Sequence, residues 1–174
     1  MNIIEYADIF KDLATKNKAI RNGGEKEDGT IRNSFFRAND EGEIIQATNG
    51  AGISYPYLAI YDYAGVLSDN GVIEDLMFGR FVIRDKVKSN LKYDDIQDAK
   101  RKTHNIGMQI IMFLYDAMLN DQNKAVIPEL LINTVRYTFI GAINDSEIGC
   151  EFSFQFKDTA FNIYEVDFSK LFDL

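Results

Sequence analysis

The chain has 174 residues, of which 46% are hydrophobic and 13% aromatic, and its formal net charge is −8. This length and composition predict a single domain, 1–174, with a substantial core. The acidic balance argues against a nucleic-acid surface, because phosphate contacts need clustered Lys and Arg. The single cysteine, Cys150, excludes an intramolecular disulfide.

The N-terminal region predicts an amphipathic helix followed by a loop. Asn2 and Glu5 have the spacing of a capping box, and the apolar residues after them recur at helical spacing, which predicts a helix over 3–19. Residues 21–30 (RNGGEKEDGT) contain glycine and charge with almost nothing apolar, so we expect a mobile loop over 21–33. This loop lacks the glycine spacing of a phosphate-binding motif, and the pattern after it does not predict a helix.

Two short strand-like pieces follow, TIRNSFFRA (30–38) and EIIQAT (43–48), and the sequence NDEG between them predicts a turn. Asn49 and Gly50 form a strong turn signal before the next strand. The motif GAG that begins at Gly50 resembles the start of a dinucleotide-binding fingerprint. Its third glycine is missing and a strand pattern follows, so a turn is favoured over a cofactor loop.

The stretch SYPYLAIYDYAG (54–65) contains four tyrosines with a period of two. As a strand it has one face made of Tyr55, Tyr57, Ala59, Tyr61 and Tyr63. Leu58 and Ile60 point the other way, and Pro56 predicts the start of a strand or an edge. Three interpretations of the tyrosine face stay open: burial in the fold, a protein–protein contact, or stacking on a ligand.

The segment LMFGRFVIRDKVK (76–88) follows a second turn, SDNG (68–71), and alternates apolar with basic residues. It predicts a half-buried strand whose outer face is basic. The basic residues are Arg80, Arg84, Lys86 and Lys88. They are either the ordinary wet face of a strand or a contact for acidic residues of another copy, which the net charge supplies in excess.

Residues 94–119 predict a long helix, because Asp94 and Gln97 have capping-box spacing and the apolar residues after them form one stripe. The members of this stripe are Ile96, Ala99, Thr103, Ile106, Ile110, Phe113 and Ala117. The first half of the helix is polar and the second half is apolar. We therefore expect the second half to be buried deeply and the first half to project.

Two further strands are expected after Pro128, over 130–143 and 149–158, with the turn NDSE between them. The second strand alternates apolar and polar residues, which is typical of an antiparallel sheet with one wet face. The final residues, 160–174, predict a strand or an arm. Together these elements predict an α+β fold, in which a mainly antiparallel sheet packs against one long helix and an N-terminal helix is added.

No residue pattern predicts catalysis or a metal centre. His104 is the only histidine and lies in the polar half of the predicted long helix. Cys150 lies on the apolar face of a predicted strand, where a thiol is usually inert. Zinc prefers several His and Cys ligands, and neither NDSEIG nor SDNGVIED has the spacing of a calcium loop. We therefore expect no enzyme activity, no cofactor and no metal ion.

Nothing in the chain predicts secretion or membrane insertion. The N-terminal sequence lacks a basic region followed by an apolar run, so it does not predict a signal peptide. The longest apolar run, IGMQIIMFLY, is far shorter than the roughly 20 residues that span a bilayer. We expect a soluble protein with no membrane partner and no direct nucleic-acid partner.

Three features together resemble the tail terminator and head–tail completion proteins of tailed bacteriophages and related contractile systems. YPYLAIYDY (55–63) is similar to their extended strand near the middle, the predicted helix over 94–119 follows it, and GCEFSFQF (149–156) is similar to their closing strand. The resemblance covers residues 55–157. It implies a structural virion protein that forms an oligomeric ring at the tail end or the head–tail junction, with no catalytic residue.

The resemblance also implies partners and a location. The partners are other copies of the chain and other tail or connector proteins, and the ring is part of a virion assembled in the bacterial host cytoplasm. The candidate subunit-interface residues are Tyr57, Tyr61, Tyr63, Arg80, Arg84, Lys86 and Lys88. The alternative function is a small non-catalytic binding module that uses an aromatic sheet face for a glycan or a peptide.

Overall fold

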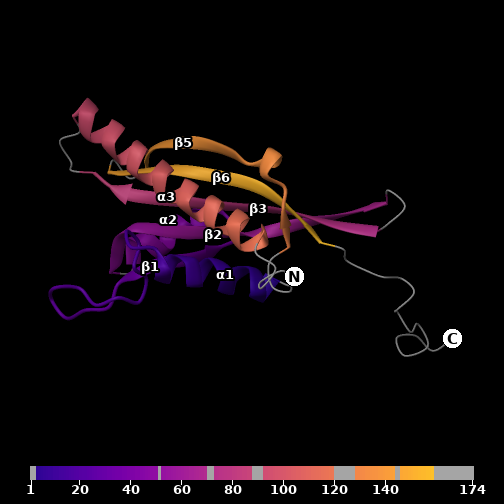
Figure 1. The fold of residues 1–174 in the computed structure, drawn as a ribbon. Coiled ribbons are helices and arrows are strands. Elements are labelled where there is room, and N and C mark those ends of the chain that lie inside the picture. The colour runs from indigo at the N-terminus through magenta and orange to yellow at the C-terminus, as the bar shows by residue number, and fades with distance from the viewer. Residues whose placement is uncertain are drawn as a thin grey trace.

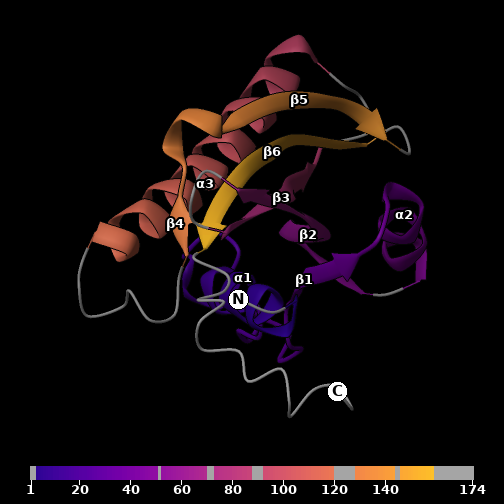
Figure 2. The ribbon, with the colours of Figure 1, turned by 90° about the vertical axis from the view of Figure 1, so that its right-hand side faces the viewer.

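The protein folds into a sheet with helices on both faces (Figures 1 and 2). The computed structural model describes residues 3–50, 52–69, 73–87, 92–119, 128–143 and 146–158. The helices α1 (Ile3–Lys16) and α3 (Tyr93–Leu119) pack on one face of the sheet, and α2 (Glu41–Gly50) packs on the other. The predicted α+β class, with one long helix packed on the sheet, is confirmed.

Six strands form the sheet in the described part of the chain. They are β1 (Asn33–Ala38), β2 (Ile53–Asp69), β3 (Ile73–Lys86), β4 (Glu129–Leu130), β5 (Arg136–Ile143) and β6 (Glu147–Asp158). Their order is β1-β2-β3-β6-β4, and β5 also pairs with β6. Only β1 and β2 pair in parallel, and the other described pairs are antiparallel. The sheet is therefore mixed but mainly antiparallel, as predicted.

The predicted strand EIIQAT (43–48) is wrong, because these residues lie in α2. The turn predicted at NDEG instead caps this helix. Asp40 Oδ1 accepts the backbone N–H of Glu43 at 3.0 Å, and the Glu43 carboxylate accepts the backbone N–H of Asn39 at 2.8 Å. The expected Asn-Gly turn also lies within α2. The helix is the crossover that allows β1 and β2 to run in parallel.

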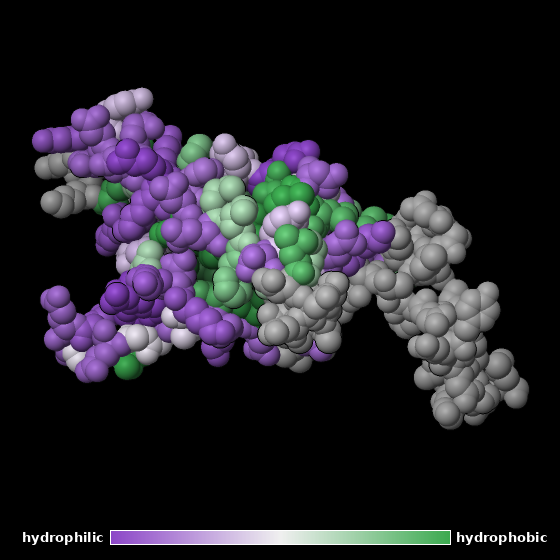
Figure 3. Space-filling view, in the orientation of Figure 1, coloured by the Kyte–Doolittle hydropathy of each residue, from purple (hydrophilic) through white to green (hydrophobic). Residues whose placement is uncertain are grey.

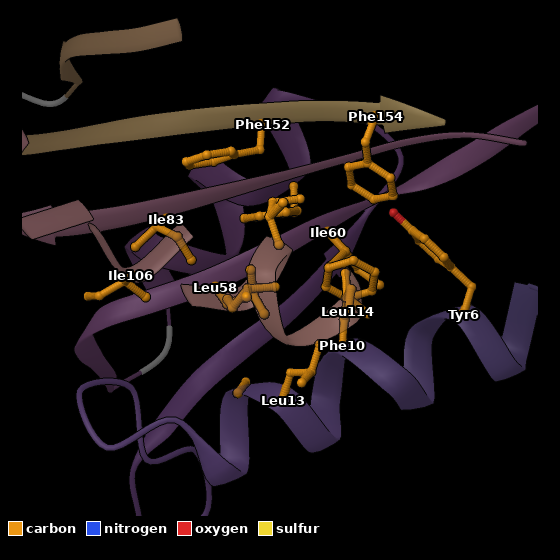
Figure 4. Packing of buried hydrophobic residues seen from close by; sticks show 14 of the residues in the cluster. Tyr6, Phe10, Leu13, Leu58, Ile60, Ile83, Ile106, Leu114, Phe152 and Phe154 are labelled. Carbon is orange, nitrogen blue, oxygen red and sulfur yellow. The ribbon is translucent and has the colours of Figure 1, made fainter. Parts of the chain in front are cut away.

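The main core lies between the sheet and the helices α1 and α3. Figure 4 shows Phe10 and Leu13 projecting from α1 toward the sheet. Phe81 of β3 and Phe152 of β6 stack with ring centroids 5.0 Å apart, and the Phe10 ring lies 5.5 Å from that of Phe81. The predicted apolar face of β6 is confirmed, and its four members are all buried: Cys150, Phe152, Phe154 and Phe156.

The long helix α3 begins one residue before the predicted helix and ends where predicted. Its buried residues are Ala99, Thr103, Ile106, Gly107, Ile110, Ile111, Leu114 and Ala117. Phe113 was expected among them but is 51% exposed, because the buried stripe passes through Ile111 and Leu114 instead. Figure 3 shows hydrophobic side chains gathered over the C-terminal half of α3, so this half is apolar on its outer side as well.

The predicted loop over 21–33 forms a hydrogen-bonded hairpin. The backbone N–H of Gly23 donates to the Arg32 carbonyl oxygen at 2.9 Å, and Arg32 returns a bond to Gly24 at 2.8 Å. Gly23 has φ +76° and Gly29 has φ +79°, a region that glycine adopts without a side-chain clash. The mobility of this loop stays a prediction.

Some predictions fall outside the described residues: Lys88, the segment 160–174 and the middle of the SDNG turn. Asp69 and Ile73 pair across that turn, so β2 and β3 form a long hairpin. No helix in the described ranges is both long enough and apolar enough to cross a bilayer.

Candidate functional site

Most of the candidate interface residues lie on the sheet face opposite α1 and α3. Tyr57 pairs with Arg84 and Tyr61 with Arg80 in the β2–β3 register, so these four residues share one face. The helix α2 covers part of it, with Ile44 packed against Tyr57 and Tyr61. The face therefore has two parts, one under α2 and one open to solvent.

The tyrosine row is not a continuous surface. Tyr57 is fully buried and Tyr61 is 3% exposed, and the covering elements are α2 and β1 rather than α3. Tyr63 was expected on the same face, and this is wrong. Its ring packs against Tyr6 of α1, with centroids 5.4 Å apart. The β2–β3 register shifts between Tyr61 and Ala64, and this β-bulge reverses the alternation.

Glu147 at the start of β6 accepts hydrogen bonds from two tyrosines. The Tyr57 hydroxyl donates to Glu147 Oε2 at 3.1 Å, and the Tyr55 hydroxyl donates to Oε1. Because Glu147 is buried, these bonds satisfy a carboxylate that water reaches poorly. Burial is the largest cause that raises the pKa of both hydroxyls, and Glu147 raises it further. The tyrosines under α2 are therefore structural and do not form a platform for a ligand.

Replacement of Tyr57 by phenylalanine is expected to weaken the loss of stability at alkaline pH. The folded-state pKa of Tyr57 lies above its ordinary value of about 10, so the unfolded chain releases this proton at a lower pH than the folded chain. The resulting stabilisation is present below about pH 10 and is lost as the pH rises further. Urea unfolding from neutral to alkaline pH measures the slope of the free energy of unfolding.

The matched control for this change is Tyr93→Phe, because Tyr93 is 74% exposed. This variant should keep the alkaline slope of the wild type. Equal slopes for Tyr57→Phe and the wild type would contradict the expected role of Tyr57. At neutral pH, Tyr57→Phe should cost about 1 kcal/mol, because Glu147 loses one of its two phenolic donors.

Arg84 is buried under α2 and is not presented to solvent. Its side chain is 1% exposed, and its Nη2 atom lies 2.5 Å from Glu41 Oε1 of α2. A buried guanidinium without a partner is costly, so Glu41 neutralises Arg84 and holds α2 on the sheet. A contact between Arg84 and another chain would require α2 to leave the sheet. Lys86 remains exposed, with Nζ 5.8 Å from the centroid of the Tyr55 ring.

Arg80 lies at the border between the covered and the open part of the face. Its guanidinium lies 3.9 Å above the centroid of the Tyr61 ring, and its Nη1 lies 3.8 Å from Glu151 Oε1. Burial raises the pKa of the Glu151 carboxyl, and the charge of Arg80 partly opposes this. Four basic residues were expected to form one outer basic face, but Arg80 and Lys86 are the exposed ones among those that the structure describes.

Beyond Arg80 the sheet face is open to solvent. This open face consists of Ala64, Val66, Leu76, Phe78, Arg80, Ser153 and Gln155. A hollow of about 320 Å³ lies on it, lined by residues that include Tyr61, Arg80 and Thr134. Apolar side chains at one end and a guanidinium at the other are typical of a surface that binds protein.

The ends of β2 and β3 project beyond the body of the protein as a hairpin (Figure 1). We call residues 66–69 and 73–76 the hairpin arm. The pairing of β6 with β3 extends only to Asp75, so the tip of the arm is two-stranded in the described part of the chain. Val66 is 54% exposed and Leu67 is 64% exposed. The arm therefore presents two apolar side chains that the described strands do not cover.

The two residues considered for catalysis lie on the helix-covered face of the sheet. The His104 ring packs against Tyr137 with centroids 4.6 Å apart and against Phe152 with centroids 6.0 Å apart. Cys150 is fully buried, and burial raises the pKa of its thiol to about 12, so it is not available as a nucleophile. Among the residues that the structure describes, no three His, Cys, Asp or Glu side chains gather to hold a metal ion.

Comparison with known proteins does not assign a family. The chain matches no protein-family model, and no curated protein shows significant sequence similarity to it. The sequence contains the SDNG turn and the apolar Val66 and Leu67 before it, but the pattern of these residues does not predict that both are exposed.

Proposed function

We propose that this protein is a structural subunit of a phage or phage-like tail, and that its copies form a ring at the tail end or the head–tail junction. The observation that carries the proposal is the hairpin arm, which extends past the body with Val66 and Leu67 exposed. Other tail or connector proteins would contact the finished ring. Assembly would take place in the bacterial host cytoplasm, and the ring would become part of the virion.

The energetic support comes from the apolar surface of the arm and the open face. Val66, Leu67 and Phe78 are 54%, 64% and 40% exposed. Full burial of such a side chain contributes roughly 1.5–3 kcal/mol. Each subunit of a ring contacts two neighbours, so these side chains are buried in every interface of the ring. Their burial favours the closed assembly over the free chain.

The position of the arm is suited to a contact between neighbouring copies in a ring. The arm projects from one side of the body, as Figure 1 shows. A contact between this side and a different surface of the next copy is heterologous, and heterologous contacts close into rings or continue as filaments. The phage-tail part of the proposal comes from the sequence resemblance, whose two strings fall in β2 and β6.

The alternative of a ligand-binding aromatic face has less support. Tyr57 and Tyr61 are covered by α2, and Tyr63 packs on the opposite face against α1. A glycan or peptide would therefore meet only the open face, where Phe78 is the exposed aromatic residue among those described on it. A module of that kind would work as a single copy, which separates it from a ring subunit.

Light scattering after size-exclusion chromatography tests the proposal over a wide range of concentrations. The expected mass is a multiple of the 19.8 kDa chain, and electron micrographs should show closed rings. Leu67→Asp should shift the protein toward monomer. Ile31→Asp is the control, because Ile31 is 63% exposed in the 21–33 loop and should leave assembly unchanged. A monomer at every concentration would contradict the proposal.

A further inference from the structure

A groove lies between α1 and α3 on the helix-covered side of the sheet. The residues that line it are Leu13, Lys16, Asn17, Gln109, Ile110 and Phe113. The Asn17 side-chain amide donates to Gln109 Oε1 at 3.3 Å and links the two helices. The volume of the groove is about 200 Å³. Small-molecule sites usually have roughly 300–1,000 Å³, so the groove fits protein side chains better than a metabolite.

We infer that this groove receives the hairpin arm of a second copy of the chain, an inference that rests on the proposed ring. The two surfaces have matching apolar content. Leu67 and Val66 are exposed on the arm, whereas Phe113 (51%) lines the groove and Met112 (52%) is exposed beside it in the sequence of α3. Neither pair has a cover within the described residues, and packing one on the other removes both from water.

The charges of the two surfaces are complementary. The sequence of the arm, VLSD (66–69) and IEDL (73–76), has three acidic residues and no basic residue. The end of α1 and the residues after it contain Lys16, Lys18 and Arg21, and all three are exposed. Lys16 pairs with Asp12 at 2.7 Å, but both side chains are exposed, so this pair holds the lysine weakly. Opposite charges on two surfaces favour their encounter and set their orientation.

The arm and the groove of one chain lie apart, so their contact needs a second copy. Figure 1 shows α1 beginning near the side from which the arm projects and running away from it. The last turn of α1, which contains Leu13 and Lys16, therefore lies farther from the arm than the first turn of the helix does. An arm that reaches forward into the groove of the next copy makes a head-to-tail contact, which is the type that a ring requires.

Engineered cysteines test this contact in the full-length chain. Leu67→Cys and Phe113→Cys chains carry tags of different length and are produced together in one cell. The native Cys150 is fully buried, so only the new thiols should react. Under oxidation we expect a disulfide-linked pair of one long and one short chain, detected on a non-reducing gel. A single chain with both substitutions should give a ladder of linked copies that ends at the size of the ring.

In the control, the cysteine is placed in the 21–33 loop by Ile31→Cys instead of in the arm. Ile31 has an exposed fraction similar to that of Leu67, and this cysteine should give no link to Phe113→Cys. A Leu67–Leu67 link alone would overturn the inference, because the arms would then pair with each other. Normal rings without a Leu67–Phe113 link would also overturn it, yet would leave the proposed function standing. A protein that is monomeric by light scattering would contradict the proposed function itself.

A charge-exchange experiment gives a second measurement that needs no disulfide. Asp75→Lys in the arm and Lys18→Glu beside the groove should each weaken assembly at low salt, because like charges then face each other. The chain with both changes should recover assembly. If the double variant assembles no better than the weaker single variant, the two surfaces do not meet.

Discussion

Replacement of Glu41 by alanine is expected to destabilise the protein by about 2–3 kcal/mol. The change leaves Arg84, which is 1% exposed, without the carboxylate that lies 2.5 Å away. Removal of one partner of a buried ion pair typically costs about 3–5 kcal/mol, because the other charge stays buried and uncompensated. The expected cost of Glu41→Ala is smaller than this typical cost because the Glu41 side chain is 51% exposed and solvent screens the pair.

Two variants decide whether this cost comes from the buried guanidinium. Asp62→Ala breaks the Arg37–Asp62 pair, which has a similar distance of 2.6 Å but is more exposed, and should cost less than about 1 kcal/mol. The double variant Glu41→Ala, Arg84→Met removes both charges and should be more stable than Glu41→Ala alone. Urea unfolding measures all three. A Glu41→Ala variant as stable as Asp62→Ala would show that α2 does not depend on this pair.

The role of Glu41 also shows why the covered part of the site could not be predicted. The alternation of Arg80 and Arg84 with apolar residues correctly placed both on one face of β3. The cover over Arg84 comes from α2. The sequence pattern predicts a strand for these residues, because a short apolar run does not distinguish the helical period of about 3.6 residues from the strand period of two. The signal that distinguishes them was the pair Asp40 and Glu43, which caps the helix.

The two longest periodic segments were predictable because each repeats its pattern many times. The 27 residues of α3 and the alternation in β6 each define one buried side without reference to the rest of the chain. The bulge after Tyr61 has no such local signal. It depends on how β2 and β3 pair, and it moved Tyr63 to the other face of the sheet.

The exposed surfaces depend on the relative lengths of neighbouring elements. The sequence predicts the hairpin of β2 and β3, but not that β6 pairs with β3 only as far as Asp75 and leaves the tip uncovered by described strands. Likewise, burial of Phe113 would require another element to cover the side of α3 on which Phe113 lies. The groove beside α1 lies on that side instead. Both features that carry the proposed assembly are therefore tertiary properties.

Replacement of Gly107 by alanine is expected to destabilise the protein by about 2 kcal/mol. A Cβ atom at this position of α3 would lie 2.0 Å from Cε2 of Phe152, far inside contact distance. Phe152 cannot easily withdraw, because its ring stacks on Phe81 with centroids 5.0 Å apart. Alanine stabilises a helix interior by up to about 1 kcal/mol relative to glycine, whereas overpacking a core costs about 1–3 kcal/mol. An overlap this severe places the cost at the upper end.

The matched control is Gly141→Ala in β5, where an added Cβ meets no atom within 4 Å, and its effect should be small. Gly107→Ala combined with Phe152→Leu should recover part of the loss if the overlap with the ring is its cause. Because Ile110 and Phe113 follow Gly107 on the same helix, a displaced α3 also moves one wall of the groove. Gly107→Ala should therefore weaken assembly in light scattering as well as lower the free energy of unfolding. A variant more stable than the wild type would show that helix propensity outweighs the overlap.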